Sequence, residues 1–343
     1  MSELEPLSQR IQAPTDLPVV VHAALAEVRP ATIDDLEALV TLTHAAEAVD
    51  HPSWASPREE VEDLLEGPMI DAAVDTLIGF DAAGRALAFA SIMPASSADT
   101  RVQVYTNGIV HPEVRTQGIG TMLLTWTKAR ALQHLATREE TLPAWIAMYA
   151  QERTVDAIAV GLDAGFTVER YFHTMERDLA ADIPDIAIAD EFEIVTLTPE
   201  LREPTRLARN NSFRDHWGSQ PTSPEKWERF VTGEIFRPDL SVVAVERGTT
   251  NVVGFTLSSV NEDDTELQGY RASYIDLIGV VRERRGHKLA PALIAEALRR
   301  ARADGLAKAT LDVDSSSPTG ANTLYEGMGF TATDVEVALV IEL

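Results

Sequence analysis

The sequence of 343 residues contains no cysteine. Disulfides, thiolate metal sites and a cysteine nucleophile are therefore excluded, as expected of a protein from a reducing compartment. Long apolar runs are missing too, whereas about 18 consecutive apolar residues would be needed to span a bilayer. The first ten residues, MSELEPLSQR, carry acids where a signal peptide carries basic residues. We therefore expect a cytoplasmic protein without a membrane-spanning segment.

Positively charged side chains are scarce. The chain has 29 Lys+Arg against 54 Asp+Glu, a formal net charge of −25. Because phosphates and anionic lipids are bound by clustered Lys and Arg, this balance disfavours general binding to nucleic acid or to a membrane. The 8 histidines lack a spacing such as His-x-x-x-His, and we predict no metal site. Neither a Gly-x-Ser-x-Gly elbow nor a Walker-type loop is present.

What the sequence does contain is an internal repeat. Its 45% apolar and 24% charged residues are typical of a globular protein, and its length suggests two domains. Both halves show the same signals in the same order at nearly constant spacing, so we interpret the chain as two copies of one α/β unit. The landmarks in the first and second half are the β-like runs at Val28 and Phe192, the Ser-Pro helix starts at Ser56 and Ser223, the strand residues Phe89 and Phe255, and the pairs Gly165-Phe166 and Gly329-Phe330.

The composition also suggests domain boundaries. Residues 1–24 contain three prolines and are treated as an N-terminal tail whose order the sequence leaves open. The first domain is predicted over 25–180 and the second over 192–343. Residues 181–191 are predicted to be a linker, because Pro, small residues and acids alternate there.

A turn in the first copy has the character of an anion site. A predicted strand ends at Val110, and a helix is predicted from about Gln117. Gly118 and Gly120 lie where the strand turns into the helix, so the backbone can approach a ligand and the first helical N–H groups can bind an anion. A tight turn that binds nothing would show the same spacing.

The second copy repeats this turn and adds basic charge. RERRGHK, residues 282–288, contains four Lys/Arg and one Glu, the most concentrated basic segment near a helix start. Pro291 falls in the first turn of the predicted helix, where its missing N–H costs little. A solvated basic turn is one interpretation. A site for a polyanionic ligand is the interpretation we favour.

This pattern resembles the GNAT acetyltransferase superfamily, whose members use acetyl-CoA. The family fingerprint, Arg-x-x-Gly-x-Gly or Ala at the head of a long helix, is complete over residues 115–120. In the second copy it spans 285–290, with Lys288 where the family usually has its middle glycine, and the closing Leu-Tyr-Glu-x-x-Gly-Phe segment follows at 324–330. The doubled arrangement and the segment FRDHWGSQPTSPEKW resemble actinobacterial tandem acetyltransferases of the mycothiol-synthase type.

The resemblance implies a fold and a co-substrate. The fold class is α/β, with two tandem GNAT folds, each a mixed, mostly antiparallel twisted sheet flanked by helices. The first domain would be non-catalytic and the second catalytic, with acetyl-CoA as co-substrate and no metal. The cofactor contacts it implies are Ile278, Val280, Arg285, Gly286, Lys288 and Ala290 in the second copy, and Val110, Arg115, Gly118 and Gly120 in the first.

Two catalytic residues follow from the resemblance. An amine must lose a proton before it attacks a thioester, and the family can place an acid four residues before the valine that contacts the cofactor. Counting back from Val280 gives Asp276 as the base. Tyr325 matches the family tyrosine that protonates the departing thiolate. An ion-paired strand-end carboxylate and a packed helix tyrosine are the structural alternatives.

The first copy departs from this pattern. When the two copies are aligned on their Gly-Phe pairs, Tyr325 is matched by Gly161 in the first copy. The residue four before Val110, which would match Asp276, is Thr106. The first copy is therefore predicted to have a cofactor turn without the chemistry, either binding acetyl-CoA or only bracing the second copy. Lys288 leaves two alternatives: it blocks the approach of a phosphate, or it supplies a cation to it, which its basic neighbours favour.

The acceptor is less defined by the sequence. His216 and Trp217 are candidate substrate contacts in a loop-like segment, where a tryptophan packed under the loop is an equal alternative. We expect transfer of an acetyl group to a primary amine of a small molecule, by a monomer or homodimer. The alternatives are an inactive CoA-binding tandem module, a mycothiol-synthase-like enzyme and a protein N-acetyltransferase.

Overall fold

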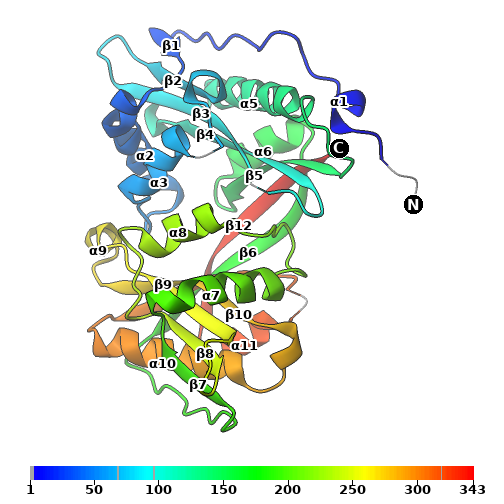
Figure 1. The fold of residues 1–343 in the computed structure, drawn as a ribbon. Helices are drawn as coiled ribbons and strands as arrows, with labels where there is room; N and C mark the ends of the chain where they lie inside the picture. The colour runs from blue at the N-terminus through cyan, green and yellow to red at the C-terminus, as the bar shows by residue number, and fades with distance from the viewer. Residues whose placement is uncertain (1–3, 68, 96, 318) are drawn as a thin grey trace. The chain divides into compact units, whose positions relative to one another are not determined.

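The computed structural model describes residues 4–67, 69–95, 97–317 and 319–343, so the first three tail residues lie outside the described part. It divides into two compact units (Figure 1). Unit 1 comprises Met1–Arg170 with Glu336–Leu343, and unit 2 comprises Tyr171–Val335. The repeat assigns the last eight residues to the second copy, whereas they pack with unit 1. The domain boundaries given above stay a prediction.

Unit 1 contains a mixed, mostly antiparallel sheet. Its strand order is β1-β2-β3-β4-β5-β12, in which β4 and β5 run parallel and the other neighbours antiparallel. Residues 336–342 of β12 complete this sheet beside β5. The strands are β1 (Glu27–Arg29), β2 (Thr76–Phe80), β3 (Ala86–Pro94), β4 (Val102–Val110), β5 (Ala144–Gln151) and β12 (Thr331–Glu342).

Helices cover both faces of this sheet (Figure 1). Because side chains alternate along a strand, Phe89 of β3 packs with α2 and α3 while its neighbours Ala88 and Ala90 pack with α5. The helices and helical turns of this part are α1 (Leu7–Arg10), η1 (Ile33–Asp35), α2 (Leu36–Asp50), α3 (Arg58–Glu66), α4 (Ala72–Asp75), η2 (Pro112–Val114), α5 (Ile119–Leu135) and α6 (Val155–Asp163).

The tail that the sequence left open is packed on unit 1 from residue 4 onward. Leu7 of α1 is fully buried in the core below α5, and its N–H donates to the carbonyl of Glu140 at 3.0 Å. Val20 is 6% exposed and joins the cluster around Trp126 of α5. Burying these side chains supplies the free energy that orders an otherwise proline-rich segment.

Unit 2 repeats the architecture. Its strand order is β6-β11-β10-β9-β8-β7, with β10 and β11 parallel and the other neighbours antiparallel. The strands are β6 (Thr167–Asp178), β7 (Phe192–Thr196), β8 (Val242–Glu246), β9 (Val252–Ser259), β10 (Ala272–Val280) and β11 (Lys308–Asp314). Strand β6 precedes the linker, so the sequence places it in the first copy, yet it pairs with β11 from Phe172 to Asp178.

The helices of unit 2 also lie on two faces. Leu201 of α7 and Trp227 of α8 pack on one face around Phe255, and Leu289 and Leu293 of α10 pack on the other. The helices and helical turns are α7 (Pro199–Ser212), α8 (Pro224–Thr232), α9 (Asp263–Gln268), η3 (Arg282–Arg284), α10 (Leu289–Ala303) and α11 (Ala321–Gly327). The repeat predicted from the sequence is confirmed, since β2 to β6 correspond in order to β8 to β12, with α5 matching α10 and α6 matching α11.

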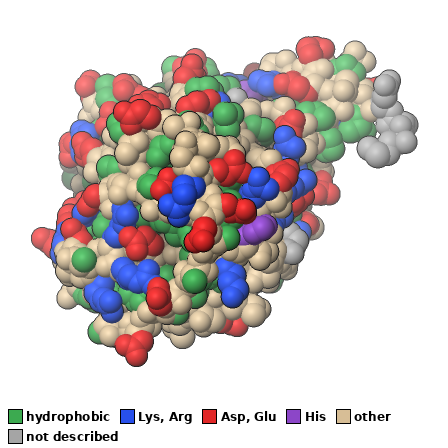
Figure 2. Space-filling view, turned by 60° about the horizontal axis from the view of Figure 1, so that its bottom comes forward, with side chains coloured by type: hydrophobic (Ala, Val, Ile, Leu, Met, Phe, Trp, Pro, Cys, Tyr) green, Lys and Arg blue, Asp and Glu red, His purple; other side chains and the backbone are tan. Residues whose placement is uncertain are grey.

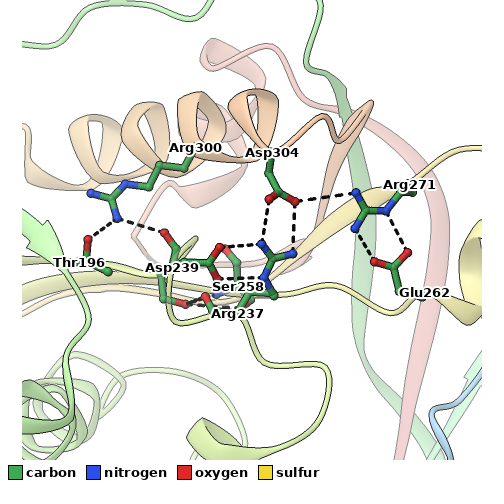
Figure 3. Close-up of polar contacts among 9 residues, drawn as sticks. Thr196, Arg237, Asp239, Ser258, Glu262, Arg271, Arg300 and Asp304 are labelled. Carbon is green, nitrogen blue, oxygen red and sulfur yellow. Dashed lines mark hydrogen bonds and ion pairs between the residues drawn. The ribbon is translucent and has the colours of Figure 1, made fainter.

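A network of charges holds the far end of α10 (Figure 3). Arg237 binds Asp239 through two hydrogen bonds of 2.9 and 2.6 Å and also reaches Asp304, the residue that ends α10. Arg271 pairs with Glu262 and approaches Asp304 at 3.9 Å. Because several charges share partners, the network fixes the helix better than isolated surface pairs would. None of the helices in the described ranges has both the length and the apolar character to cross a bilayer.

Candidate functional site

The second copy has an opening between two parallel strands. β10 and β11 pair only over Ala272–Tyr274 and Lys308–Thr310, although β10 continues to Val280 and β11 to Asp314. The two strands therefore diverge, and the β10 edge beyond Tyr274 is not hydrogen-bonded to β11. Such an edge offers backbone donors and acceptors to an extended ligand.

The orientation of the N–H groups along β10 follows from its other neighbour. The N–H of Val281 donates to the carbonyl of Val253 at 2.9 Å, on the β9 side. Because donors alternate along an antiparallel strand, the N–H groups of Ile278 and Val280 point the other way, into the opening. These are the two residues at which the sequence predicts contacts with an acetyl-CoA-like ligand.

A β-bulge places Asp276 at this opening. The β9–β10 register shifts between Ile275 and Leu277, so Asp276 is an inserted residue. Ile275 packs on the α10 face whereas Leu277 packs on the α7 face, although they would share a face in a regular strand. The Asp276 carboxylate is half-buried and accepts a hydrogen bond from the Ser259 hydroxyl at 3.1 Å. Its predicted role as a base stays a prediction.

The turn after β10 is a preformed cradle at a helix N-terminus. Gly286 has φ +85° and Lys288, the N-cap of α10, has φ +59°. A Cβ built on Gly286 would meet no atom within 4 Å, so the space in front of the turn is open. The first amides of α10 have no acceptor inside the helix and can bind an anion. The turn therefore fits a pyrophosphate on geometry as well as on sequence.

The basic charge at this turn is smaller than the sequence suggested. Arg282 and Arg285 both pair with Asp215, and Arg284 pairs with Glu246. On the face that Figure 2 presents, Lys and Arg side chains are in general interspersed among Asp and Glu. The idea of a concentrated basic patch is therefore corrected, because two acids far away in sequence pair with three of its four cations.

Lys288 differs from the three arginines. No ion pair involves its ammonium group within the described residues, and its side chain is exposed. Its backbone adopts the left-handed conformation that glycine favours, as Gly118 does at φ +92° in the first copy. Replacing the family glycine has therefore kept the shape of the turn and added a cation to it.

Tyr325 lies in the short helix α11 and is 8% exposed. Its ring packs edge-on against Phe330 with centroids 6.1 Å apart, in the same core cluster as Ile275, the residue before Asp276, and Ile278, two residues after it. Burial raises the pKa of the Tyr325 phenol to about 12. The phenol is therefore protonated throughout the neutral range and able to donate a proton.

The loop after α7 carries the two candidate acceptor contacts. The His216 ring lies 5.2 Å from that of Phe213, and the Trp217 ring lies 6.2 Å from that of Phe172. Burial lowers the pKa of His216, and nearby Asp314 opposes this in part. His216 is thus held in its neutral form at pH 7, where it would not repel a cationic amine.

The first copy has a similar turn with different surroundings. Thr116 and Gly118 have φ +58° and +92°, and Gly118 faces open space. The N–H of His111 donates to the carbonyl of Leu87 at 2.8 Å, so the N–H of Val110 points into the opening between β4 and β5. Arg115 makes two hydrogen bonds of 2.6 and 2.8 Å to Asp50, which commits its guanidinium to the protein.

Counterparts of Asp276 and Tyr325 are missing from the described residues of the first copy. β3 and β4 pair from Val110 to Val104 without a register shift, so no inserted residue corresponds to Asp276. Thr106, found by counting, is buried and donates to the carbonyl of Ala147 at 3.2 Å. A Cβ on Gly161 would lie 2.9 Å from Met148 Sδ and 3.2 Å from Leu339 Cδ2, so a phenol there would require these side chains to move.

Sequence reasoning missed two polar residues at the opening. Asp314 ends β11, is 2% exposed, and accepts a hydrogen bond from the N–H of Ser316 at 2.8 Å. Ser259 holds Asp276 from the neighbouring strand. The only signal for Asp314 was its place at the end of an apolar strand before a serine-rich turn. Nothing in the sequence indicated Ser259, because its contact depends on the bulge.

Known proteins share this arrangement. Residues 205–330 match the family model described as the acetyltransferase (GNAT) family. A mycothiol acetyltransferase from Nocardiopsis dassonvillei is 29% identical over 274 residues, which cover 74% of this chain and 78% of that protein.

Solved structures show the same fold across both copies. A GCN5-related N-acetyltransferase from Sphaerobacter thermophilus superimposes with a TM-score of 0.69 at 24% identity, covering 92% of this chain and 95% of that one. A tandem GNAT protein from the clavulanic acid biosynthesis pathway gives 0.65 at 18% identity, covering 92% and 98%. Residues 205–330 therefore match the GNAT family, both copies share the fold of solved GNAT proteins, and the similarity to mycothiol acetyltransferases supports an acetyl-CoA-dependent acetyltransferase.

Proposed function

We propose that the second copy transfers the acetyl group of acetyl-CoA to the primary amine of a small molecule. The observation that carries this proposal is the bulge at Asp276, which puts a carboxylate at the opening beside the core cluster that holds Tyr325. An acetyl thioester and an amine brought to this opening would meet one proton acceptor and one proton donor. The first copy, without bulge or phenol, would not catalyse transfer.

The co-substrate would be held mostly by backbone groups. The N–H groups of Ile278 and Val280 would bind the pantetheine arm, and the turn from Arg285 to Ala290 would hold the pyrophosphate. Gly286 would allow a close approach and Lys288 would supply a cation. Arg285, which donates to the Ser212 carbonyl at 3.0 Å, would mainly keep the turn in place.

The acetyl transfer would proceed through a tetrahedral intermediate, with Asp276 as base and Tyr325 as acid. Asp276 takes a proton from the substrate ammonium, directly or through water, and the free amine attacks the thioester carbonyl carbon. The backbone N–H near Val280 would stabilise the oxyanion of the tetrahedral intermediate. The C–S bond then breaks, the Tyr325 phenol protonates the CoA thiolate, and the phenolate takes a proton from the former amine nitrogen through water. Asp276 releases the first proton to solvent, so the products are an amide, free CoA thiol and one proton.

The acceptor class is supported by the charge and the aromatic character of nearby side chains. Neutral His216, which senses the charge of Asp314, the Trp217 ring against Phe172, and the carboxylates of Asp276 and Asp314 would offer aromatic and acidic groups that suit a cationic amine. A mycothiol-type acceptor is the second candidate, and its specific support is the similarity to mycothiol acetyltransferases.

An amine panel tests the proposal. Purified protein with acetyl-CoA is screened for release of free thiol against small primary amines, a mycothiol precursor and a peptide with a free N-terminus. We expect turnover with at least one small amine and its loss in Tyr325→Phe. Turnover with the peptide alone would indicate a protein N-acetyltransferase. Binding of acetyl-CoA without turnover on any amine would indicate an inactive CoA-binding module, and either result would refute the proposal.

A further inference from the structure

Helix α11, which carries Tyr325, is too short to fix its own orientation. It spans seven residues, Ala321–Gly327, and isolated helices of this length are not stable in water. Its N-terminal end is tied to β11, because the side-chain amide of Asn322 donates to the carbonyl of Asp314 at 2.9 Å. Where the Tyr325 hydroxyl lies thus depends on what holds the C-terminal end.

A buried arginine holds that end. Arg177 of β6 is 3% exposed, and its Nε donates to the carbonyl of Met328, the C-cap of α11, at 2.6 Å. Its other two nitrogens donate to the carbonyls of Asp182 in the linker, at 2.7 Å, and of Asp178, at 3.0 Å. A cation at a helix C-terminus is favoured by the helix dipole and satisfies carbonyls that the helix leaves open.

The contacts of Arg177 lead directly to Tyr325. The carbonyl of Tyr325 accepts hydrogen bonds from the N–H groups of Met328 and Phe330, both at 3.0 Å. A Cβ on Gly329 would lie 3.3 Å from Arg177 Nε, so the guanidinium lies against the same turn. Phe330, the residue after this turn, packs on the Tyr325 ring. The arginine, the turn and the phenol form one continuous set of contacts.

The Arg177 guanidinium binds main-chain carbonyls and no carboxylate in the described residues. No carboxylate pairs with Arg177 in the part of the chain that the structure describes, so its charge is spent on main-chain carbonyls. An open pocket of about 370 Å³ is lined by Arg177, by residues 181–184 and by residues 327–329. The turn therefore has room to shift when the guanidinium is removed.

We propose that Arg177 is a positioning residue, which sets the place of the Tyr325 hydroxyl by binding the C-terminal turn of α11. Arg177 belongs to β6, a strand that the sequence assigns to the first copy. The residue that positions Tyr325 of the second copy therefore comes before the linker. This inference rests on the proposed role of Tyr325 as general acid. It goes beyond that role by naming the residue on which the acid depends.

A double-mutant cycle tests the proposal. kcat and the KM for acetyl-CoA are measured by thiol release for wild type, Arg177→Gln, Tyr325→Phe and the double variant. Since misplacing a reacting group by about 1 Å can cost about 100-fold, we expect Arg177→Gln to lower kcat by roughly tenfold or more, with KM changed less than about twofold. In the Tyr325→Phe background we expect Arg177→Gln to lower kcat less than about twofold. An equal fall in both backgrounds would show a merely structural role and overturn the proposal.

A matched control and a more conservative variant complete the test. Arg299 of α10 also donates to a linker carbonyl, that of Pro184 at 2.9 Å, but among the described residues it makes no hydrogen bond or ion pair to α11, so Arg299→Gln should leave kcat unchanged. If Arg177→Gln does not fold, Arg177→Lys takes its place in the cycle. A lysine ammonium group cannot reach all three carbonyls that the guanidinium binds. A roughly threefold fall in kcat that appears only when Tyr325 is present supports the proposal. An unchanged kcat refutes it.

The cycle also separates this inference from the proposed function. If Tyr325→Phe itself leaves kcat unchanged, the proposed acid role fails. If Tyr325→Phe lowers kcat and folded Arg177→Gln does not, only the positioning role fails.

Discussion

Replacing Lys288 by glycine should strengthen the fold and weaken the binding of acetyl-CoA at once. Lys288 has φ +59° and ψ +20°, a left-handed conformation that costs a residue with a Cβ about 1–2 kcal/mol. Glycine removes this strain but gives back roughly 0.4–1 kcal/mol through the larger entropy of the unfolded chain. The net expectation for Lys288→Gly is a gain of about 0.5–1 kcal/mol in the free energy of unfolding.

The expected loss of affinity comes from the ammonium group. A hydrogen bond to a charged group contributes about 1.5–3 kcal/mol when it is buried. Because Lys288 is exposed and solvent screens it, we take about 1 kcal/mol, which corresponds to a roughly fivefold rise in the Kd for acetyl-CoA. The effect should shrink as ionic strength rises.

The assay separates the two effects with a matched control. Lys288→Ala removes the ammonium group and keeps the Cβ, so it should lose the same affinity without the gain in stability. Titration calorimetry in a Gly118→Glu background reads the second turn alone, and urea unfolding reads stability. If Lys288→Gly leaves the Kd unchanged, Lys288 is not a phosphate contact. If it unfolds at lower urea than its parent, the strain argument is wrong.

Two further predictions concern the scaffold. Gly161→Tyr puts a phenol where the second copy has one and should overpack against Met148 and Leu339, which lowers the free energy of unfolding by about 1–3 kcal/mol and therefore the urea midpoint. It should not raise thiol release. An unchanged urea midpoint would show that the site can hold the phenol. The hydrogen bonds from Arg237 lower the pKa of Asp239, so this pair stabilises the fold at pH values above the carboxyl's unfolded pKa and stops doing so as pH falls through the folded pKa. Asp239→Asn should therefore reduce stability at pH 7 by about 0.2–1 kcal/mol and flatten its dependence on acid pH; an unchanged acid transition would contradict this.

The features that the sequence predicted correctly are those that local patterns determine. The strand, turn and helix around Gly118 and Lys288 depend on apolar periodicity and on residues within one turn, and the structure has them within two residues of the predicted place. The α/β class and the repeat follow from the same kind of pattern, because each copy must bury the same faces.

The features that the sequence did not predict depend on which strands are neighbours in the sheet. The bulge at Asp276 is defined by pairing with β9, and the places of β6 and β12 depend on partners far away in sequence. Counting residues therefore matched Asp276 with Thr106, although the insertion leaves Asp276 without a counterpart. The charge of the basic turn was overestimated for the same reason, since Asp215 and Glu246 come from other loops and strands. Contacts of this kind leave no local pattern in a single sequence.

The central claim is that the second copy alone performs the transfer, with Tyr325 as its acid. The most direct measurement compares thiol release by Tyr325→Phe and by Gly118→Glu, using the best amine of the panel and saturating acetyl-CoA. We predict that Tyr325→Phe loses about 100-fold or more in kcat, the usual contribution of a general acid, while Gly118→Glu keeps kcat within about threefold. Unchanged turnover in Tyr325→Phe together with its loss in Gly118→Glu would contradict the account, because it would place the chemistry in the first copy.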